Sequence, residues 1–146
     1  MNSISNDLKP PAFVSAVSRE VVAYFAKAQM PVHSRSRSYL AQFWWGNDSS
    51  VHYEIWIHEH AARIELGLHF ESNPTRNSSL YAAFGNYLLE IQDRLGESVW
   101  LEEWDKGWAR LYETLPYAPM DEARVYAVAG RFCEIMECVQ PIYETL

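Results

Sequence analysis

Cysteine is scarce in this sequence, and other absences further limit where the protein acts. The two cysteines, Cys133 and Cys138, lie five positions apart on a predicted helix, where they point in different directions and cannot form a disulfide bond. They therefore indicate reduced thiols and a cytoplasmic protein. No apolar run approaches the roughly 20 residues that cross a membrane. Residues 1–11 lack the basic and apolar segments of a secretory signal.

Positive charge is also in short supply. The sequence has 12 Lys and Arg against 19 Asp and Glu, which gives a formal net charge of −7 and a pI near 5.2. Such a chain repels nucleic acid and anionic lipid. The one basic cluster, Arg35-Ser36-Arg37 with His33 nearby, has the composition of a solvated loop. We expect neither nucleic acid nor a membrane among the partners.

The motifs of common enzyme classes are missing. No Gly-x-Ser-x-Gly, P-loop or Gly-x-Gly-x-x-Gly motif occurs in the sequence. A carboxylate pair for glycoside hydrolysis could be drawn from Glu54, Glu102 and Glu103, but their pattern is also that of an ordinary charged surface. Both cysteines lie near acidic residues, which disfavour a thiolate. The sequence therefore favours binding over catalysis, assigns no catalytic residue and indicates no cofactor.

What the chain does have is enough apolar material for one folded domain. Hydrophobic residues make up 49% of its 146 residues, which predicts a single α+β domain over residues 1–146, with residues 1–10 disordered. Helical spacing predicts helices at 11–29, from a cap at Asn77 or Ser78 to Leu95, and from a cap at Asp121 to Pro141, which bends or ends the last helix. Alternation predicts strands at 34–45, 51–58, 63–71, 99–104 and 108–114. The order α-β-β-β-α-β-β-α favours an antiparallel sheet with helices packed on one face.

The register between the strands at 51–58 and 63–71 follows from their side chains. Pairing Ile57 with Ile64, Ile55 with Leu66 and Tyr53 with Leu68 keeps the apolar residues of both strands on one face. A shift by one residue would move one set to the opposite face. The predicted register leaves residues 59–62 as the connecting loop.

The other face of this hairpin carries a candidate metal site. His52 lies opposite His69, and Glu54 and Glu71 are their neighbours at diagonal distances of about 7–8 Å. Imidazoles and carboxylates together are a ligand set for zinc or another transition metal. The alternative is a solvent-facing sheet surface with charge pairs between residues such as Arg63, Glu65 and Glu59.

Aromatic residues are abundant, at 14% of the chain with six tryptophans. A turn at residues 105–107 pairs Trp104 with Trp108 and Trp100 with Tyr112, which places several large rings on one sheet face. Trp, Tyr and Arg are the residue types enriched in binding hot spots. Two explanations stay open: an interface for a twin subunit or another protein, or a second small core covered by part of the chain. The candidate partner-binding residues are Trp56, Trp100, Trp104, Trp108, Arg110 and Tyr112.

The element order of this small acidic chain resembles the class I type III secretion chaperone-like fold, which also includes bacterial proteins outside secretion systems. The stretches His52–Trp56 and Ile64–Glu71 look like a small uncharacterised bacterial family. The runs Ile91–Gly96 and Val99–Trp104 are similar to an uncharacterised domain found beside bacterial nuclease-like modules. The chaperone resemblance implies a homodimer that binds an extended or partly unfolded segment of another protein through apolar grooves. The density of tryptophan and the His/Glu hairpin set this chain apart from secretion chaperones proper.

These patterns together predict a non-catalytic protein-binding module, homodimeric, that captures another protein through its aromatic sheet face. The alternative prediction is a domain that binds a small ligand or a metal ion through His52, Glu54, His69 and Glu71.

Overall fold

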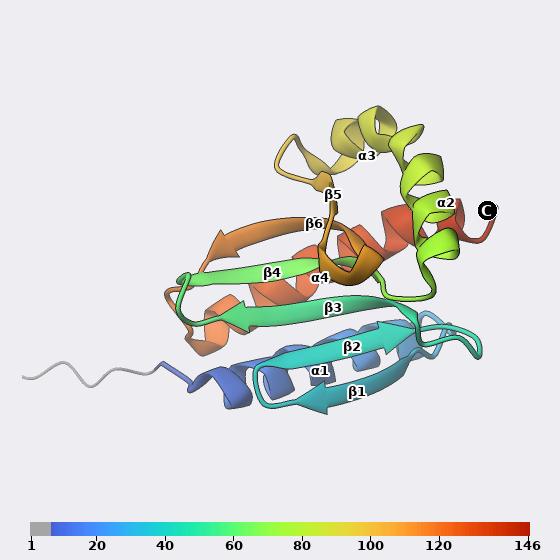
Figure 1. Ribbon diagram of the computed structural model, residues 1–146. Helices are drawn as coiled ribbons and strands as arrows, with labels where there is room; N and C mark the ends of the chain where they lie inside the picture. The colour runs from blue at the N-terminus through green and yellow to red at the C-terminus, as the bar shows by residue number, and fades with distance from the viewer. Residues whose placement is uncertain (1–6) are drawn as a thin grey trace, which may run out of the picture.

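The computed structural model describes residues 7–146, which form an antiparallel sheet with helices packed against it. Within these residues the sheet has six strands in the order β1-β2-β3-β4-β6-β5, and every neighbouring pair is antiparallel (Figure 1). The predicted α+β class is confirmed. The strands are β1 (His33–Arg37), β2 (Leu40–Trp44), β3 (Val51–His58), β4 (Arg63–Phe70), β5 (Trp100–Glu103) and β6 (Ala109–Pro116). The helices are α1 (Pro10–Lys27), α2 (Pro74–Gly85), α3 (Leu88–Leu95) and α4 (Glu122–Tyr143), and a short 3-10 turn, η1 (Asp105–Gly107), joins β5 to β6.

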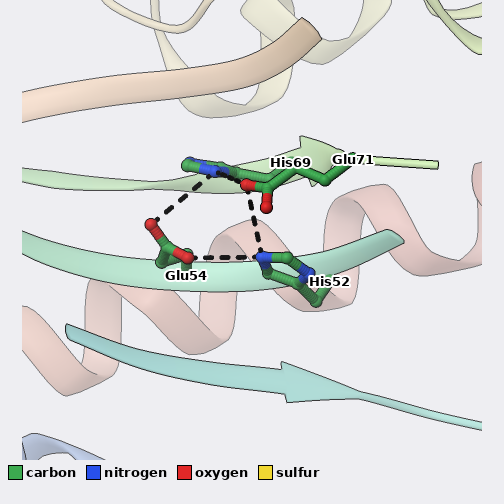
Figure 2. Close-up of side chains that lie close together, drawn as sticks. All are labelled: His52, Glu54, His69 and Glu71. Atoms are coloured by element: carbon green, nitrogen blue, oxygen red, sulfur yellow. Dashed lines mark hydrogen bonds and ion pairs between the residues drawn. The ribbon is translucent and has the colours of Figure 1, made fainter. Parts of the chain in front are cut away.

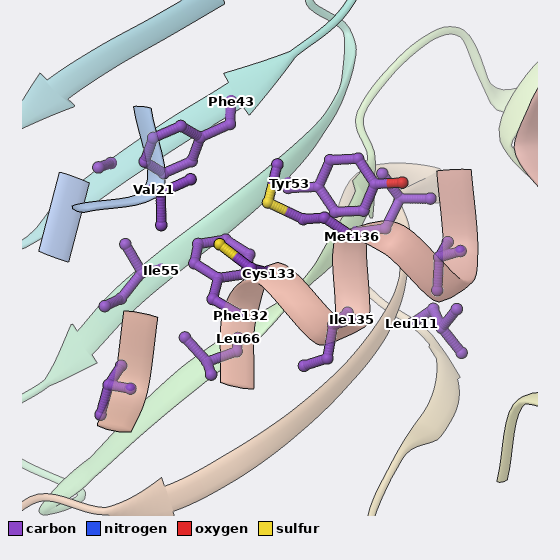
Figure 3. Packing of buried hydrophobic residues seen from close by; sticks show 14 of the residues in the cluster. Val21, Phe43, Tyr53, Ile55, Leu66, Leu111, Phe132, Cys133, Ile135 and Met136 are labelled. Atoms are coloured by element: carbon purple, nitrogen blue, oxygen red, sulfur yellow. The ribbon is translucent and has the colours of Figure 1, made fainter. Parts of the chain in front are cut away.

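One face of the sheet holds the apolar core. The predicted register of β3 and β4 is confirmed, with Ile57 opposite Ile64 and Tyr53 opposite Leu68. These four side chains are at most 2% exposed. Figure 3 shows the sheet residues of this face meeting α4, where the ring of Phe132 lies edge to face with a strand aromatic. Alternation along the strands therefore determines which face the helices cover.

Helices α1 and α4 lie side by side on this face (Figure 1). The predicted cap at Asp121 is confirmed, because its side chain accepts a hydrogen bond from the backbone N–H of Arg124. Helix α4 continues through Pro141 to Tyr143 rather than ending at the proline. A proline in the last turn removes only one helical hydrogen bond, so the helix tolerates it. Within residues 7–146, no helix is both long and apolar enough to cross a membrane.

The predicted strand at 34–45 is wrong, because this stretch is the hairpin of β1 and β2. The chain turns at Ser38 and Tyr39, and Ser38 has a φ of 37°. The turn contains no glycine, asparagine or proline, so the apolar alternation runs through it without a break. The Arg35-Ser36-Arg37 cluster, expected in a loop, therefore lies in the edge strand β1.

The predicted helix ending at Leu95 is two helices, separated at Asn86 and Tyr87. Their apolar residues form one continuous stripe because both helices pack against the same core. The ring of Phe84 in α2 stacks on Phe70 at 5.4 Å, for example. The predicted end at Leu95 is confirmed, and Gly96 follows it with a φ of 104°.

The start of α2 also differs from the prediction. Asn73 caps the helix and Pro74 is its first residue, so the helix begins before Asn77 and Ser78. Asn77 is instead 1% exposed, and its side chain donates hydrogen bonds to the backbone oxygens of Ser72 and Gly107. It joins α2 to the turn between β5 and β6.

The predicted disorder of residues 1–10 falls partly on residues 1–6, which lie outside the described residues. Within the described part, the backbone N–H of Leu8 donates to the oxygen of Met120 at 2.8 Å. Helix α1 then begins at Pro10.

Candidate metal centre and its surroundings

The sheet face opposite the helices is polar and yet buried. Along β3 and β4, His52, Glu54, Glu65 and His69 are at most 4% exposed, and Arg110 of β6 is 6% exposed. The solvent-facing alternative is therefore wrong for this hairpin. Glu65, which that alternative paired with Arg63, instead accepts hydrogen bonds from Arg110 and His69, each at 2.5 Å. Burying so many ionisable groups is costly unless each one is paired.

Hydrogen bonds connect these groups in a row that crosses the sheet. On one side, Arg35 donates to Gln42 at 2.8 Å, and Gln42 donates to Glu54 at 3.0 Å. On the other side, Arg110 donates to Glu102 at 2.8 Å, and the hydroxyl of Tyr112 donates to the same carboxylate. The contacts of His69 with Glu54 and Glu65 close the gap between the two halves. The row thus includes side chains from all six strands of the sheet.

The four predicted metal-site residues meet at the centre of this row (Figure 2). One ligand atom from each of His52, Glu54, His69 and Glu71 can be chosen so that all four lie within 4.8 Å of one another. The Nε2 atom of His52 lies 3.2 Å from Glu54 and 3.6 Å from Glu71. The Nδ1 atom of His69 lies 3.6 Å from Glu54 and 2.9 Å from Glu71. The predicted grouping is thus present in the structure.

The second nitrogen of each imidazole has a partner behind the centre. The Nδ1 atom of His52 lies 2.8 Å from the backbone oxygen of Ser49, which can only accept a hydrogen bond. The Nε2 atom of His69 lies 2.5 Å from Glu65. These contacts orient both rings so that the remaining nitrogens point at the two carboxylates.

The carboxylates and imidazoles shift one another's proton affinity. Burial alone would lower the pKa of His69, but hydrogen bonds to Glu65 and Glu71 and the charge of Glu54 raise it to about 9. Burial would raise the pKa of Glu54, but the hydrogen bond from His52 and the charge of His69 lower it overall. The centre therefore favours ionised carboxylates with a cation between them, which is either a proton on His69 or a metal ion.

The predicted aromatic residues lie beside this centre, and we call Trp56, Trp100, Trp104, Trp108 and Tyr112 the tryptophan surface. The ring of Trp104 stands edge-on to that of His69, with 5.4 Å between the ring centroids. The centroids of Trp56 and Trp108 lie 6.0 and 5.9 Å from that of Trp104. Trp104 therefore helps to shield the centre from water, and Trp56, Trp104 and Trp108 are only partly exposed. Trp100 on β5 is 55% exposed.

Arg110, the sixth predicted partner-binding residue, is buried and is not available at the surface. Its guanidinium lies between the rings of Trp104 and Tyr112, at 4.6 and 4.1 Å from their centroids. It is held there by ion pairs with Glu65 and Glu102. Its role in the structure is to neutralise buried carboxylates.

Three residues around the centre were not among the predicted site residues: Gln42, Ser49 and Glu65. Alternation does place Glu65 on the same face as His69, so its proximity was accessible from the register. Its pairing with Arg110 depends on β6 lying beside β4, with His69 opposite Arg110. No pattern in the sequence determines that strand order.

Comparison with known proteins yields one similarity of fold. No protein-family model matches the chain, and no curated protein matches it. A chain of the HopA1–SchA chaperone–effector complex is 14% identical to this one, with a TM-score of 0.42. The likeness covers 88% of this chain and 94% of that chain. The matching chain belongs to a chaperone–effector complex, and the fold that the element order resembles is that of a secretion chaperone. A likeness at this TM-score gives no evidence about function.

Proposed function

We propose that this chain is a protein-binding domain that adds an extended, acidic segment of a partner protein to its sheet at β1. The observation that carries the proposal is an exposed basic edge strand in an otherwise acidic chain. Strand β1 is an end strand of the sheet, with β2 on one side of it and no labelled strand on the other in Figure 1, and all five of its residues are exposed. Within residues 7–146, it pairs only with β2. Its outer backbone groups can therefore receive another strand.

The charge around β1 contrasts with that of the rest of the chain. Residues 21–47 include Lys27, Arg35 and Arg37 but no Asp or Glu, although the whole chain has a net charge of −7. Alternation along β1 places His33, Arg35 and Arg37 on the same side of the strand. An added strand with Asp or Glu at alternate positions would set its carboxylates beside these side chains.

Part of this basic strand is already ordered. Two guanidinium nitrogens of Arg35 donate to Gln42, and the guanidinium lies 5.3 Å from the ring centre of Trp44. The ring of His33 lies over the same indole at 5.6 Å. Less conformational entropy is lost on binding when a contact residue is held in place beforehand.

The same charges argue against a second copy of the chain as the strand that is added. Two β1 strands paired with each other would bring the arginines of one copy beside those of the other. Like charges directly opposite one another destabilise a strand pair. An acidic segment of a different protein fits this edge better.

A synthetic ten-residue peptide that alternates Glu and Thr would test the proposal by fluorescence anisotropy. We expect the full chain to bind it, and Arg37→Glu to weaken binding by about tenfold or more, because each close charge pair is reversed. Lys27→Glu is the matched control, since Lys27 lies in the same basic stretch but at the end of α1. Methylating the peptide's backbone nitrogens at one alternate set of positions should abolish binding, and the other set should tolerate it. Equal binding by wild type and Arg37→Glu would contradict the proposal.

A second candidate is self-association through the tryptophan surface, as a homodimer. It is favoured by Trp100, a large side chain that is 55% exposed on the edge strand β5. Light scattering should then show a dimer that Trp100→Ala dissociates. Leu89→Ala is the control, because Leu89 is 82% exposed on α3 and is not one of the residues of this surface. A wild-type chain that is monomeric at every concentration would rule the homodimer out.

A further inference from the structure

Each imidazole nitrogen of His52 and His69 has a hydrogen-bond partner, and the outer partners, Ser49 and Glu65, determine which nitrogens face the carboxylates. The backbone oxygen of Ser49 requires a proton on Nδ1 of His52, so the Nε2 atom is left to face Glu54 and Glu71. Glu65 in the same way occupies Nε2 of His69 and leaves Nδ1 facing the same carboxylates. Histidines that bind metals nearly always donate their other ring N–H to a backbone carbonyl or a carboxylate. Both partners of that kind are present here.

We infer that His52, Glu54, His69 and Glu71 form a binding site for one divalent transition-metal ion, with zinc as the best fit. This site is separate from the β1 edge and independent of the proposed function. Two of its ligands come from β3, His69 comes from β4, and Glu71 follows the last residue of β4. Ser49 and Glu65 are positioning residues that fix the tautomers of the ligands.

The spacing of the ligand atoms suits a tetrahedral ion. Atoms that lie about 2.0–2.2 Å from a tetrahedral zinc ion stand roughly 3.3–3.6 Å apart. The contacts between imidazole nitrogens and carboxylate oxygens span 2.9 to 3.6 Å, with His52 and His69 facing different oxygens of Glu54, and one atom from each of the four residues can be chosen within 4.8 Å of the others. An ion could therefore enter with small side-chain adjustments.

The donor types decide between classes of ion. Two imidazole nitrogens suit zinc, copper or nickel, whereas calcium and magnesium prefer six or more oxygen ligands. The ligands are also nearly inaccessible, with His52, Glu54 and His69 at most 4% exposed. A site whose four ligands all come from the protein, with Glu71 alone partly exposed, holds its ion rather than presenting it to a substrate.

The bound ion would stabilise the end of the sheet beside α2. It would join β3 to the segment after β4, where the backbone N–H of Glu71 already donates to the oxygen of Ser50 at 2.8 Å. It would also balance carboxylates that are buried with few cations around them. The competing arrangement has a proton on the imidazoles in place of the ion, and the experiment distinguishes the two.

The test is a calorimetric titration of Zn²⁺ into the full chain, purified without a polyhistidine tag and freed of metal by a chelator. We expect one ion per chain, and Glu71→Gln to weaken binding by about tenfold or more. Glu71 suits this purpose because its side chain is 18% exposed, so the amide is compatible with folding. His60→Ala is the matched control, since His60 is an exposed histidine in the β3–β4 loop. The absence of stoichiometric binding, or an equal loss in His60→Ala, would overturn the site.

A second measurement on the wild-type chain does not depend on how the variants fold. Co²⁺ held tetrahedrally by nitrogen and oxygen ligands absorbs visible light strongly, whereas Co²⁺ on surface carboxylates and water is octahedral and nearly colourless. We expect the intense spectrum to appear at one equivalent and to vanish on addition of excess Zn²⁺. A weak octahedral spectrum would contradict the inferred geometry.

Discussion

The two faces of the sheet are buried to similar extents by different means. On the helix face, Ile55 and Leu66 lie opposite each other and are both 0% exposed beneath α4. On the other face, Glu65 and His69 are also 0% exposed, although the four α-helices of residues 7–146 pack elsewhere. Their cover comes from neighbouring side chains, above all the indole of Trp104. Burial on the helix face removes apolar surface from water, whereas burial on the polar face requires a partner for every charge.

Alternation along a strand therefore does not distinguish a buried face from a solvent-exposed face. It distinguishes a face of apolar side chains that pack against helices from a face of polar side chains that need hydrogen-bond and charge partners. The polar face therefore depends on complete pairing, and a single missing partner leaves buried charges without compensation. Substitutions on the two faces should therefore destabilise the fold by different mechanisms.

The largest expected effect comes from removing Glu65. Glu65→Ala leaves Arg110 and His69 buried without their shared partner and should lower the free energy of unfolding by about 3–5 kcal/mol. Leu66→Ala, at the next position on the helix face, should lower it by about 2–5 kcal/mol through a cavity. Urea unfolding in the presence of a chelator measures both. A loss of less than about 1 kcal/mol in Glu65→Ala would mean that the polar face does not depend on pairing.

Removing the charge of Glu65 without creating a cavity sharpens the same comparison. Glu65→Gln keeps the side chain's shape and its acceptor oxygen, so it should destabilise less than Glu65→Ala. If the two variants are equally stable, the charge of Glu65 rather than its contacts accounts for the effect.

The features of the fold and site that follow from local sequence pattern could be predicted, whereas those that depend on strand order could not. The register of β3 and β4 follows from Ile57 and Ile64, and it places His52 opposite His69 without further information. The site was therefore accessible from the sequence, but its burial was not. Burial depends on Arg110 arriving from β6 and on the indole of Trp104 folding over His69, which are contacts between segments far apart in the chain.

The misplaced elements have a similar physical cause. The β1–β2 turn at Ser38 and Tyr39 contains no glycine, asparagine or proline, and the break between α2 and α3 leaves the apolar stripe intact. In both places the tertiary packing, rather than local propensity, determines where the chain changes direction.

A medium-sized effect is expected at Gly67, which lies between Glu54 of β3 and Tyr112 of β6. A Cβ atom there would lie 2.4 Å from the backbone oxygen of Leu111 and 2.6 Å from the Cβ atom of Tyr112. Gly67→Ala should therefore push β4 and β6 apart and lower the free energy of unfolding by about 1–3 kcal/mol. Gly130→Ala in α4 is the control, because a Cβ atom there meets nothing within 4 Å. That substitution should be neutral or stabilise the helix by up to about 1 kcal/mol, and a similar loss in both variants would contradict the steric explanation.

The prediction with the smallest expected effect tests whether the helix face excludes a charged side chain. Burial raises the pKa of the Cys133 thiol from 9.0 to about 12, with a further contribution from the charge of Glu137. The folded state therefore keeps this proton at pH values where the unfolded chain has lost it. The resulting stabilisation is complete below the unfolded pKa of 9 and is lost as the pH rises from 9 towards 12. By pH 10 the loss should be about 1.4 kcal/mol.

Urea unfolding at pH 8 and pH 10 measures this loss, and Cys133→Ala, which removes the thiol, should reduce the difference between the two pH values. The side chain of Tyr53, whose pKa burial raises well above 10, begins to contribute near pH 10 and contributes more at higher pH, so part of the difference should remain in Cys133→Ala. An unchanged difference in Cys133→Ala would mean that the thiol is ionised within the fold. The helix face would then accommodate a charge as the polar face does, and the contrast between the two faces would fail at that position.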